Sequence, residues 1–215
     1  MLKLYTYFRS SAAYRVRIAL NLKGLSYEAI PVHLIREGGQ QNHDAYRTLS
    51  PLGTVPTLET GNEAITQSLA IIEYLDETHR QAPLLPDSPA DRARVRELAL
   101  TIACDIHPIN NLRVLNYLTC EFGVGTAQKG NWYRHWISEG LQAVEALLAA
   151  SPATGTFCHG ETPGLADCCL VPQVFNARRF ACPLENMPTI RRIVAACEVL
   201  PAFQEAAPDR QPDAE

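Results

Sequence analysis

The chain has 215 residues, of which 47% are hydrophobic and 20% are charged, and its formal net charge is −4. These proportions are typical of a globular protein, and the lack of concentrated positive charge argues against nucleic acid or an anionic membrane as a partner. The sequence has no apolar run near the roughly 20 residues of a membrane span and no signal-peptide pattern at its start, so we expect a cytoplasmic location.

The first 82 residues alternate between strand and helix patterns. Strands are expected over Leu2–Tyr7, Tyr27–His33, Val55–Leu58 and Ala64–Thr66, and helices over Ser10–Leu22 and Leu69–Thr78. The stretch Arg36–His43 is polar and loop-like, and Gly61-Asn62 is a turn signal that joins the last two strands as a hairpin. This order of elements predicts a thioredoxin-like α/β domain.

A proline-containing linker, Gln81–Pro89, separates this part from one that shows only helical periodicity. The expected helices cover Asp91–Leu118, Trp132–Ala150, Ala166–Ala177 and Pro188–Leu200. We therefore predict two domains, residues 1–82 and 88–215, the second of them all-helical. The polar tail Ala207–Glu215 is expected to be loosely held.

The seven cysteines argue against metal and disulfide chemistry. Their number is odd, and no two of them stand in a Cys-x-x-Cys spacing. This pattern disfavours a disulfide framework, a zinc ribbon and a dithiol redox centre. We expect most of these residues to be core thiols in a reducing compartment, and we expect no metal site.

Two serines, Ser10 and Ser11, stand where the first strand meets the first helix. A helix N-terminus presents N–H groups and the positive end of the helix dipole, so it can hold an anion such as a thiolate. The chain has no cysteine at this place, so the thiol would come from a ligand. The simpler alternative is that both serines only cap the helix.

Two more candidate binding places follow in the first domain. In this fold pattern, Val55-Pro56 is the expected place of a cis peptide, which would turn the Val55 backbone toward a peptide-like ligand. An ordinary trans proline at a strand start is the alternative. Gln67 and Ser68 precede the next helix, with Ser68 as the expected N-cap, and a carboxylate would bind there. The alternative is again a simple cap.

The segment Asp105–Arg113 is polar for a helix that otherwise packs in a core. Its candidates for lining a cleft between the domains are His107, Asn111 and Arg113, and Pro108 is expected to kink or restart the helix. The alternative is a structural histidine and a solvated arginine.

The pair Arg178-Arg179 ends a later apolar helix and would attract a dianionic acid, unless it is there only because cations are favourable near a helix C-terminus. Asp167, near the start of that helix, is expected to accept backbone N–H bonds as a folding element.

On these residues the chain resembles the zeta class of the glutathione transferases along nearly its whole length. The strongest motif is Tyr7–Gly24, which matches the family's Ser-Ser-Cys-x-x-Arg-Val-Arg-Ile-Ala-Leu block. The supporting blocks are Gly38–Gln41, Val55–Leu58, Gln67–Leu75, Leu170–Val174 and Arg179-Phe180. The resemblance implies the glutathione transferase fold, a thioredoxin-like α/β domain followed by an all-α domain, and a homodimer.

The resemblance also implies glutathione as the cofactor and assigns residues to it by position. The implied contacts are Ser10 and Ser11 at the thiolate, Gln41 at the glycyl end, Val55 at the cysteinyl backbone, and Gln67 and Ser68 at the γ-glutamyl group. The opposite wall would be lined by His107, Asn111 and Arg113. Arg179 would reach a substrate carboxylate, with Arg9 or Arg113 as further candidates.

Two positions depart from the family pattern. The cysteine that follows the two serines in the family is Ala12 here, so any role of that thiol is missing. The helix cap that the family writes as Ser/Thr-x-x-Asp reads Gly164-Leu-Ala-Asp167, and we expect a small loss of stability from it.

The activity that the resemblance implies is glutathione-dependent cis–trans isomerisation of maleylacetoacetate in tyrosine breakdown. A thiolate would add to the double bond of this small dicarboxylic diketo acid, the resulting single bond would rotate, and the thiolate would leave. Isomerisation of maleylpyruvate needs the same fold, cofactor and basic residues and stays an alternative. A conjugating transferase or a glutathione-binding carrier is a third.

Overall fold

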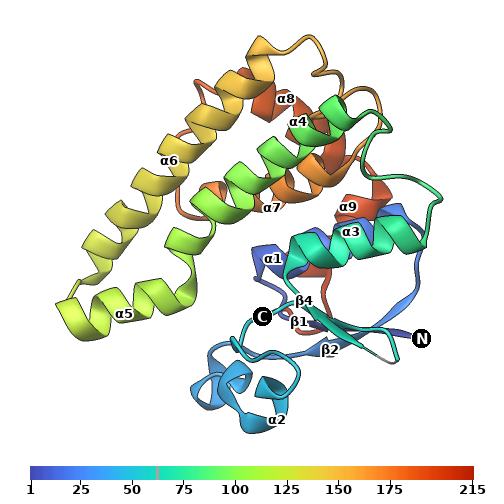
Figure 1. Ribbon diagram of the computed structural model, residues 1–215. Coiled ribbons are helices and arrows are strands. Elements are labelled where there is room, and N and C mark those ends of the chain that lie inside the picture. The colour runs from blue at the N-terminus through green and yellow to red at the C-terminus, as the bar shows by residue number, and fades with distance from the viewer. Residues whose placement is uncertain (62) are drawn as a thin grey trace. The chain divides into compact units, whose positions relative to one another are not determined.

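The computed structural model describes residues 1–61 and 63–215 (Figure 1), and the chain divides into two compact units. The first unit contains residues 1–84 together with 199–215, and the second contains residues 85–198. The predicted domains, 1–82 and 88–215, differ from this division in the C-terminal segment. That segment belongs to the first unit because its helix α9 (Pro201–Ala206) packs against α1 (Ser11–Leu22).

Within the described residues, the first unit holds a sheet of four strands in the order β2-β1-β3-β4. These strands are β1 (Leu2–Thr6), β2 (Tyr27–Pro31), β3 (Thr57–Glu59) and β4 (Ala64–Thr66). β1 pairs with β2 in parallel, and β3 pairs with β1 and with β4 in antiparallel fashion. The thioredoxin-like prediction is confirmed. The hairpin of β3 and β4 is also present, but Asn62 of its predicted turn lies outside the described residues.

Helix α1 is buried on more than one side. Val16, Ala19 and Leu20 have no exposed surface, as their spacing predicted, and Ile18 has none either. Both α3 (Ser68–Thr78) and α9 pack against α1, as Figure 1 shows. A helix that is covered by two others needs apolar residues around much of its circumference, which explains why its apolar face is so wide.

The segment between β2 and β3 is less irregular than predicted. The expected loop Arg36–His43 contains two short 3-10 turns, Arg36–Gly38 and Gln40–Asn42, and the four-residue helix α2 (Asp44–Arg47) follows. Such short turns leave no periodic signal in a sequence, because they are too brief to repeat a hydrophobic spacing.

The expectation of a loosely held tail at Ala207–Glu215 is wrong. Pro208 and Gln211 are buried, and the Gln211 amide donates to two backbone carbonyls at 2.9 Å each. The Asp213 carboxylate accepts the Phe8 N–H at 3.0 Å. Polar composition suggested a solvated tail, but these polar groups satisfy backbone groups elsewhere in the unit, which composition does not reveal.

The second unit is helical. Its described helices are α4 (Pro89–Leu100), α5 (Leu112–Phe122), α6 (Thr126–Ala150), α7 (Leu165–Arg179) and α8 (Pro188–Glu198). α7 is buried along most of its length, and α4, α6 and α8 each pack against it. The all-α prediction is confirmed. None of the helices in the described part of the chain is long and apolar enough to cross a membrane.

The predicted helix Asp91–Leu118 is interrupted in the structure. A π-helical segment, Thr101–Ile106, follows α4, and a 3-10 turn, Pro108–Asn110, precedes α5. Pro108 was expected to break the helix, and it begins the 3-10 turn. Gly140 on α6 allows the π-helical segment to pack closely against α6, since a Cβ at position 140 would lie 2.3 Å from the Ile106 side chain.

Candidate active site

The N-terminus of α1 combines a capping hydroxyl with an open backbone donor. Ser10 is the N-cap residue, and its Oγ accepts the Ala13 N–H at 3.2 Å. Ser11 begins the helix and is 4% exposed. Among the described residues the half-buried Ala12 makes no hydrogen bond through its N–H. Ser10 therefore does cap α1, and the Ala12 N–H and the positive end of the helix dipole stay available to an anion.

A buried arginine links this helix to the start of α3. Arg15 is 2% exposed, and its Nη1 donates to the Ser68 Oγ at 3.2 Å. Two predicted binding residues of the first unit, Ser10 and Ser68, thus belong to helices that Arg15 connects. Sequence reasoning did not assign Arg15; the available signal was a pair of arginines, Arg15 and Arg17, within a helix that is otherwise rich in apolar residues.

Gln67, and not Ser68, is the N-cap residue of α3, which corrects the prediction. Ser68 is the first residue of the helix and is buried. Gln67 has φ 70° and ψ 113°, a backbone conformation that residues other than glycine rarely adopt. Such conformations concentrate at ligand-binding places, where the surrounding structure holds them.

The Val55-Pro56 peptide bond is cis, as predicted. Val55 is 7% exposed, and among the described residues neither its N–H nor its C=O makes a hydrogen bond to another backbone group. A backbone donor and acceptor on one residue suit the pairing of an extended, peptide-like ligand.

Gln41 lies in the 3-10 turn Gln40–Asn42 and is half-buried. Its Nε2 donates to the Leu34 carbonyl at 3.3 Å, while its buried Oε1 has no hydrogen-bond partner in the described residues. A Cβ on Gly39 would lie 2.6 Å from the Gln41 Nε2, so glycine at that position leaves room for the amide. An unsatisfied buried acceptor is a feature that a bound donor would relieve.

A second buried arginine, Arg17, fixes the loop that precedes Ser10. Its guanidinium donates to the Thr6 Oγ1 at 3.0 Å and to the Phe8 carbonyl at 3.0 Å. Burial lowers the pKa of Arg17 to about 10, although the nearby Tyr27 and Tyr14 hydroxyls and the Asp213 carboxylate favour its charged form. At neutral pH it therefore stays charged. Arg9, in the same loop, places its guanidinium 4.8 Å from the centre of the Phe8 ring.

In the second unit, the segment with the candidates His107, Asn111 and Arg113 lies where the helical structure is interrupted between α4 and α5. The His107 N–H donates to the Ile102 carbonyl at 3.0 Å, which closes the π-helical turn. Asn111 caps α5, since its Oδ1 accepts the Arg113 N–H at 3.1 Å. The Arg113 side chain is exposed. The Asn111 side chain thus stabilises the start of α5, a structural role that the sequence prediction did not include.

The two arginines that end α7 have different surroundings. Arg178 forms an ion pair with Glu198 on α8. Arg179 is exposed and lies 5.1 Å from the centre of the Phe180 ring. Phe180 in turn stacks on Tyr133 with ring centres 3.6 Å apart, and burial raises the pKa of Tyr133 to about 12. Arg179 is therefore the member of the pair that is available to an acidic ligand.

Neighbouring residues of α6 bring these two regions of the second unit together. The Trp132 Nε1 donates to the Ile109 carbonyl at 3.1 Å, within the broken segment that begins at His107. The next residue, Tyr133, stacks on Phe180, beside Arg179. The segment His107–Arg113 and the end of α7 thus meet the same turn of α6, although they are far apart in sequence.

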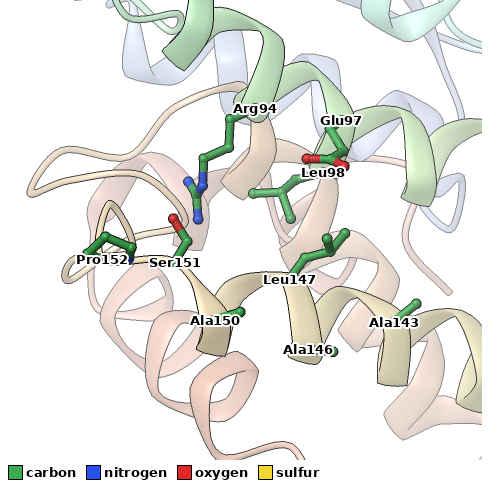
Figure 2. A pocket seen from close by; sticks show the side chains of 9 residues that line it. All are labelled: Arg94, Glu97, Leu98, Ala143, Ala146, Leu147, Ala150, Ser151 and Pro152. Carbon is green, nitrogen blue, oxygen red and sulfur yellow. The ribbon is translucent and has the colours of Figure 1, made fainter.

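A pocket of about 690 Å³ lies between α4 and α6, at a place that includes none of the predicted residues (Figure 2). Its lining is mostly apolar and includes Leu98, Ala143 and Leu147. The Arg94 guanidinium at its edge is engaged, because it donates to the Cys158 carbonyl at 2.8 Å and to the Thr154 Oγ1 at 2.6 Å. This pocket is a mostly apolar groove, and Arg94 stabilises the loop that follows α6.

Asp167 has the structural part that was predicted for it. It is 1% exposed, and its carboxylate accepts the Cys158 and Gly164 N–H groups, each at 2.9 Å. Five of the seven cysteines are buried thiols outside any disulfide, and in the part of the chain that is described no cluster of three or more His, Cys, Asp or Glu side chains is arranged to hold a metal ion.

Comparison with known proteins bears on both units. Residues 4–83 match the family model for the N-terminal domain of glutathione S-transferases. A protein of Vibrio cholerae described as a probable maleylacetoacetate isomerase is 53% identical over 211 residues, which are 98% of this chain and 97% of that protein.

Two solved structures are similar over nearly the full length. One is the holo structure of a maleylpyruvate isomerase described as a bacterial glutathione S-transferase of the zeta class; it is 50% identical with a TM-score of 0.96, and the match covers 99% of this chain and 100% of that one. The other is a maleylacetoacetate isomerase of Methylobacterium extorquens AM1 with bound malonate and glutathione, which is 39% identical with a TM-score of 0.95 and is covered to 99%, as is this chain.

Proposed function

The chain belongs to the zeta class of the glutathione transferases, and from that premise we propose that it is a glutathione-dependent cis–trans isomerase whose substrate is maleylacetoacetate. The function implied by the sequence and the names of the full-length relatives agree on this class of reaction. The choice of maleylacetoacetate follows the probable maleylacetoacetate isomerase that is 53% identical to the chain.

The observation that carries the proposal is the N-terminus of α1, where Ser10 and the open Ala12 N–H stand at the positive end of a helix. Bound glutathione would supply a thiolate that adds reversibly to the substrate double bond. Ser10 would donate its O–H to that sulfur, which requires the hydroxyl hydrogen to point away from the Ala13 N–H whose bond it accepts. Both interactions are compatible, because one hydroxyl both donates and accepts.

The other residues of the first unit fit the rest of a tripeptide. The Val55 backbone would pair with the cysteinyl residue, and the start of α3, with Gln67 and Ser68, would bind the γ-glutamyl carboxylate. The Gln41 amide would meet the glycyl end, where its buried Oε1 would accept a hydrogen bond. These assignments use backbone groups and amides, which hold a polar ligand without adding charge to the site.

In the second unit, we propose that Arg179 binds a carboxylate of the substrate, since Arg178 is already paired with Glu198. His107, Asn111 and Arg113 would contribute polar groups from the helix break, and Arg9 of the first unit is a further candidate for a carboxylate. Arginine suits this task because its planar guanidinium binds a carboxylate with two parallel hydrogen bonds. Malonate, a dicarboxylate, is bound in the related structure from Methylobacterium extorquens AM1.

A second candidate is maleylpyruvate isomerisation, because a maleylpyruvate isomerase is 50% identical to the chain over nearly its full length. The two substrates share the maleyl group and differ in the acyl end. We also propose a cytoplasmic location and a homodimeric state. Sedimentation or light scattering of the purified protein would test whether it is a dimer.

The deciding experiment measures isomerisation of maleylacetoacetate and of maleylpyruvate by the purified protein, each with and without glutathione. We expect turnover only with glutathione and a higher kcat/KM for maleylacetoacetate. A higher kcat/KM for maleylpyruvate would favour the second candidate. Binding of glutathione without turnover of either substrate would overturn the isomerase proposal and leave a conjugating transferase or a carrier.

A further inference from the structure

The end of the chain contacts the loop that leads into α1. The Asp213 Oδ2 accepts the Phe8 N–H at 3.0 Å, across 205 positions of sequence. Phe8 is only 4% exposed, so its amide is shielded from water and depends on this carboxylate for a partner. The contact lies two residues before Ser10.

The same loop is held from its other side by Arg17. The Arg17 Nη2 donates to the Phe8 carbonyl at 3.0 Å, and its Nη1 contacts the Tyr7 carbonyl at 3.4 Å. Its Nε donates to the Ala206 carbonyl at 3.0 Å, at the end of α9. The N–H and the C=O of Phe8 are therefore both fixed by charged side chains, and one of these side chains also anchors the segment that carries Asp213.

Ser10 is tied directly to this clamped loop. Its N–H donates to the Tyr7 carbonyl at 2.9 Å, so a shift of the Phe8 peptide changes the turn that presents the Ser10 hydroxyl. Arg9 lies between Phe8 and Ser10, so its backbone moves with theirs. The C-terminal segment thus helps to set the conformation of the turn that carries Arg9 and Ser10.

The last residue of the described chain contacts a second loop. Glu215 forms an ion pair with Arg36 and lies 3.2 Å from the His33 Nε2. His33 organises the segment before Gln41, because its backbone N–H donates to the Gln40 Oε1 and its carbonyl accepts the Gln40 N–H, both at 2.8 Å. The segment Gln211–Glu215 thus contacts two of the loops that carry proposed glutathione-binding residues, one with Ser10 and the other with Gln41.

We propose that the segment Gln211–Glu215 is a positioning element of the glutathione site, and that Asp213 is the positioning residue that sets the loop presenting Arg9 and Ser10. The inference rests on the proposed function, since it concerns how glutathione is held. Asp213 acts through the Phe8 amide and makes no contact with the reacting atoms in this account. Removal of its carboxylate releases a buried N–H and lets the loop adopt other conformations.

The test compares Asp213→Ala, Asp213→Asn and Asp213→Glu with the wild type. Asp209→Ala is the matched control, because Asp209 is an exposed carboxylate of the same tail and has no side-chain hydrogen bond among those of the described residues. Three quantities are measured: the KM for glutathione against kcat, the pH titration of the bound thiolate by ultraviolet absorbance, and the thermal midpoint.

For Asp213→Ala we expect the KM for glutathione to rise about ten- to hundredfold, with a raised apparent pKa of the bound thiol, because a small displacement of binding groups has effects of this size. Asp213→Asn keeps an acceptor for the Phe8 N–H and should stay within about threefold of wild type. Asp213→Glu keeps the charge but displaces the acceptor, and should lie between the two. Asp209→Ala should match the wild type.

A thermal midpoint that falls in Asp213→Ala while its KM for glutathione and its thiolate titration stay at wild-type values would overturn the inference, because Asp213 would then only stabilise the fold. If Asp213→Ala does not fold, an unchanged KM and titration in Asp213→Glu would overturn it in the same way. A wild type that fails to bind glutathione would instead remove the proposed function, and the wild-type measurement reveals that before any variant is compared.

Discussion

The N-termini of α1 and α7 each carry a short polar side chain that accepts backbone N–H bonds, but these side chains differ in burial and in chemical type, a hydroxyl at α1 and a carboxylate at α7. At α1, the half-buried Ser10 accepts one N–H, and the Ala12 N–H has no partner among the described residues. At α7, the buried Asp167 accepts the Cys158 and Gly164 N–H groups with both of its oxygens. The N-terminus of α1 can therefore receive an anion from a ligand, whereas the N-terminus of α7 already has the Asp167 carboxyl group.

This difference teaches that a helix N-terminus is not a site by itself. At α7 a buried carboxylate of the chain lies at the positive end of the helix dipole and serves folding, whereas at α1 a hydroxyl leaves that end open to an anion. The comparison therefore predicts a part in stability for Asp167 and a part in activity for Ser10, and mutations can separate the two.

The largest effect on stability is expected from Asp167→Ala. The change leaves the buried Cys158 N–H and the part-buried Gly164 N–H without an acceptor. At about 1–3 kcal/mol for each group, the free energy of unfolding should fall by about 2–6 kcal/mol in urea titrations. Burial raises the pKa of the Asp167 carboxyl because desolvation disfavours its charged form, so the neutral Asp167→Asn, which keeps one acceptor, should lose less.

The control is Glu161→Ala, which removes an exposed carboxylate from the same loop and should cost less than about 1 kcal/mol. The KM for glutathione should be unchanged in all of these variants that fold. A changed KM would contradict the separation of the two helix N-termini.

The largest effect on activity is expected from Ser10→Ala, with kcat/KM falling about 10²-fold, as when one donor to a developing or bound anion is removed. Ser88→Ala is the matched control, since Ser88 also caps a helix and its Oγ accepts the Asp91 N–H at 3.1 Å. Both variants should lose about 1 kcal/mol of stability, but only Ser10→Ala should lose activity. Equal activities would reduce Ser10 to a plain helix cap.

A smaller effect on activity is expected at the end of α7, where the two arginines Arg178 and Arg179 are compared. Arg179→Ala should raise the KM for the substrate about tenfold or more, the size expected for one charge-assisted hydrogen bond. Arg178→Ala breaks an exposed ion pair with Glu198 and should change the KM by less than about twofold. Initial rates over a range of substrate concentration would measure both, and a larger effect at Arg178 would reverse the assignment.

The smallest effect is expected from Gly164→Ser, which restores the family's hydroxyl at the N-cap of α7. Gly164 has φ −136° and ψ −161°, an extended conformation that serine also adopts. Stability should rise by a few tenths of a kcal/mol, about the difference between serine and glycine at an N-cap, and activity should stay constant. Chemical denaturation of the two proteins side by side would detect it, and a loss of stability would show that this helix start has no room for a side chain.

Much of this organisation was predictable from local patterns. The alternation in β1, the i, i+3, i+4 spacing of Val16, Ala19 and Leu20, and the break at Pro108 all correspond to the observed elements. The part of Asp167 followed from its place near the start of its helix. Each of these features is specified by residues within a few positions of one another, so sequence alone carries the signal. The cis bond at Val55-Pro56 followed from the fold pattern.

The features that sequence reasoning missed depend on contacts between distant residues. The binding of the tail to the Phe8 amide through Asp213, the link from Arg15 to Ser68, and the contacts of adjacent α6 residues with Ile109 and Phe180 join positions that are far apart in the chain. The reassignment of the α3 cap to Gln67 belongs with them, because its unusual φ angle is held by surrounding structure and not by its own preference.

The sequence by itself therefore determined the class of fold, the family and the positions of the two helix N-termini, since hydrophobic spacing and short polar motifs act locally. Only the tertiary structure decided which N-terminus is covered by a buried carboxylate, which arginine of the pair is already engaged, and that the C-terminal segment belongs to the first unit. Those outcomes depend on which groups desolvate and satisfy one another once the chain has packed, and no local pattern encodes that pairing.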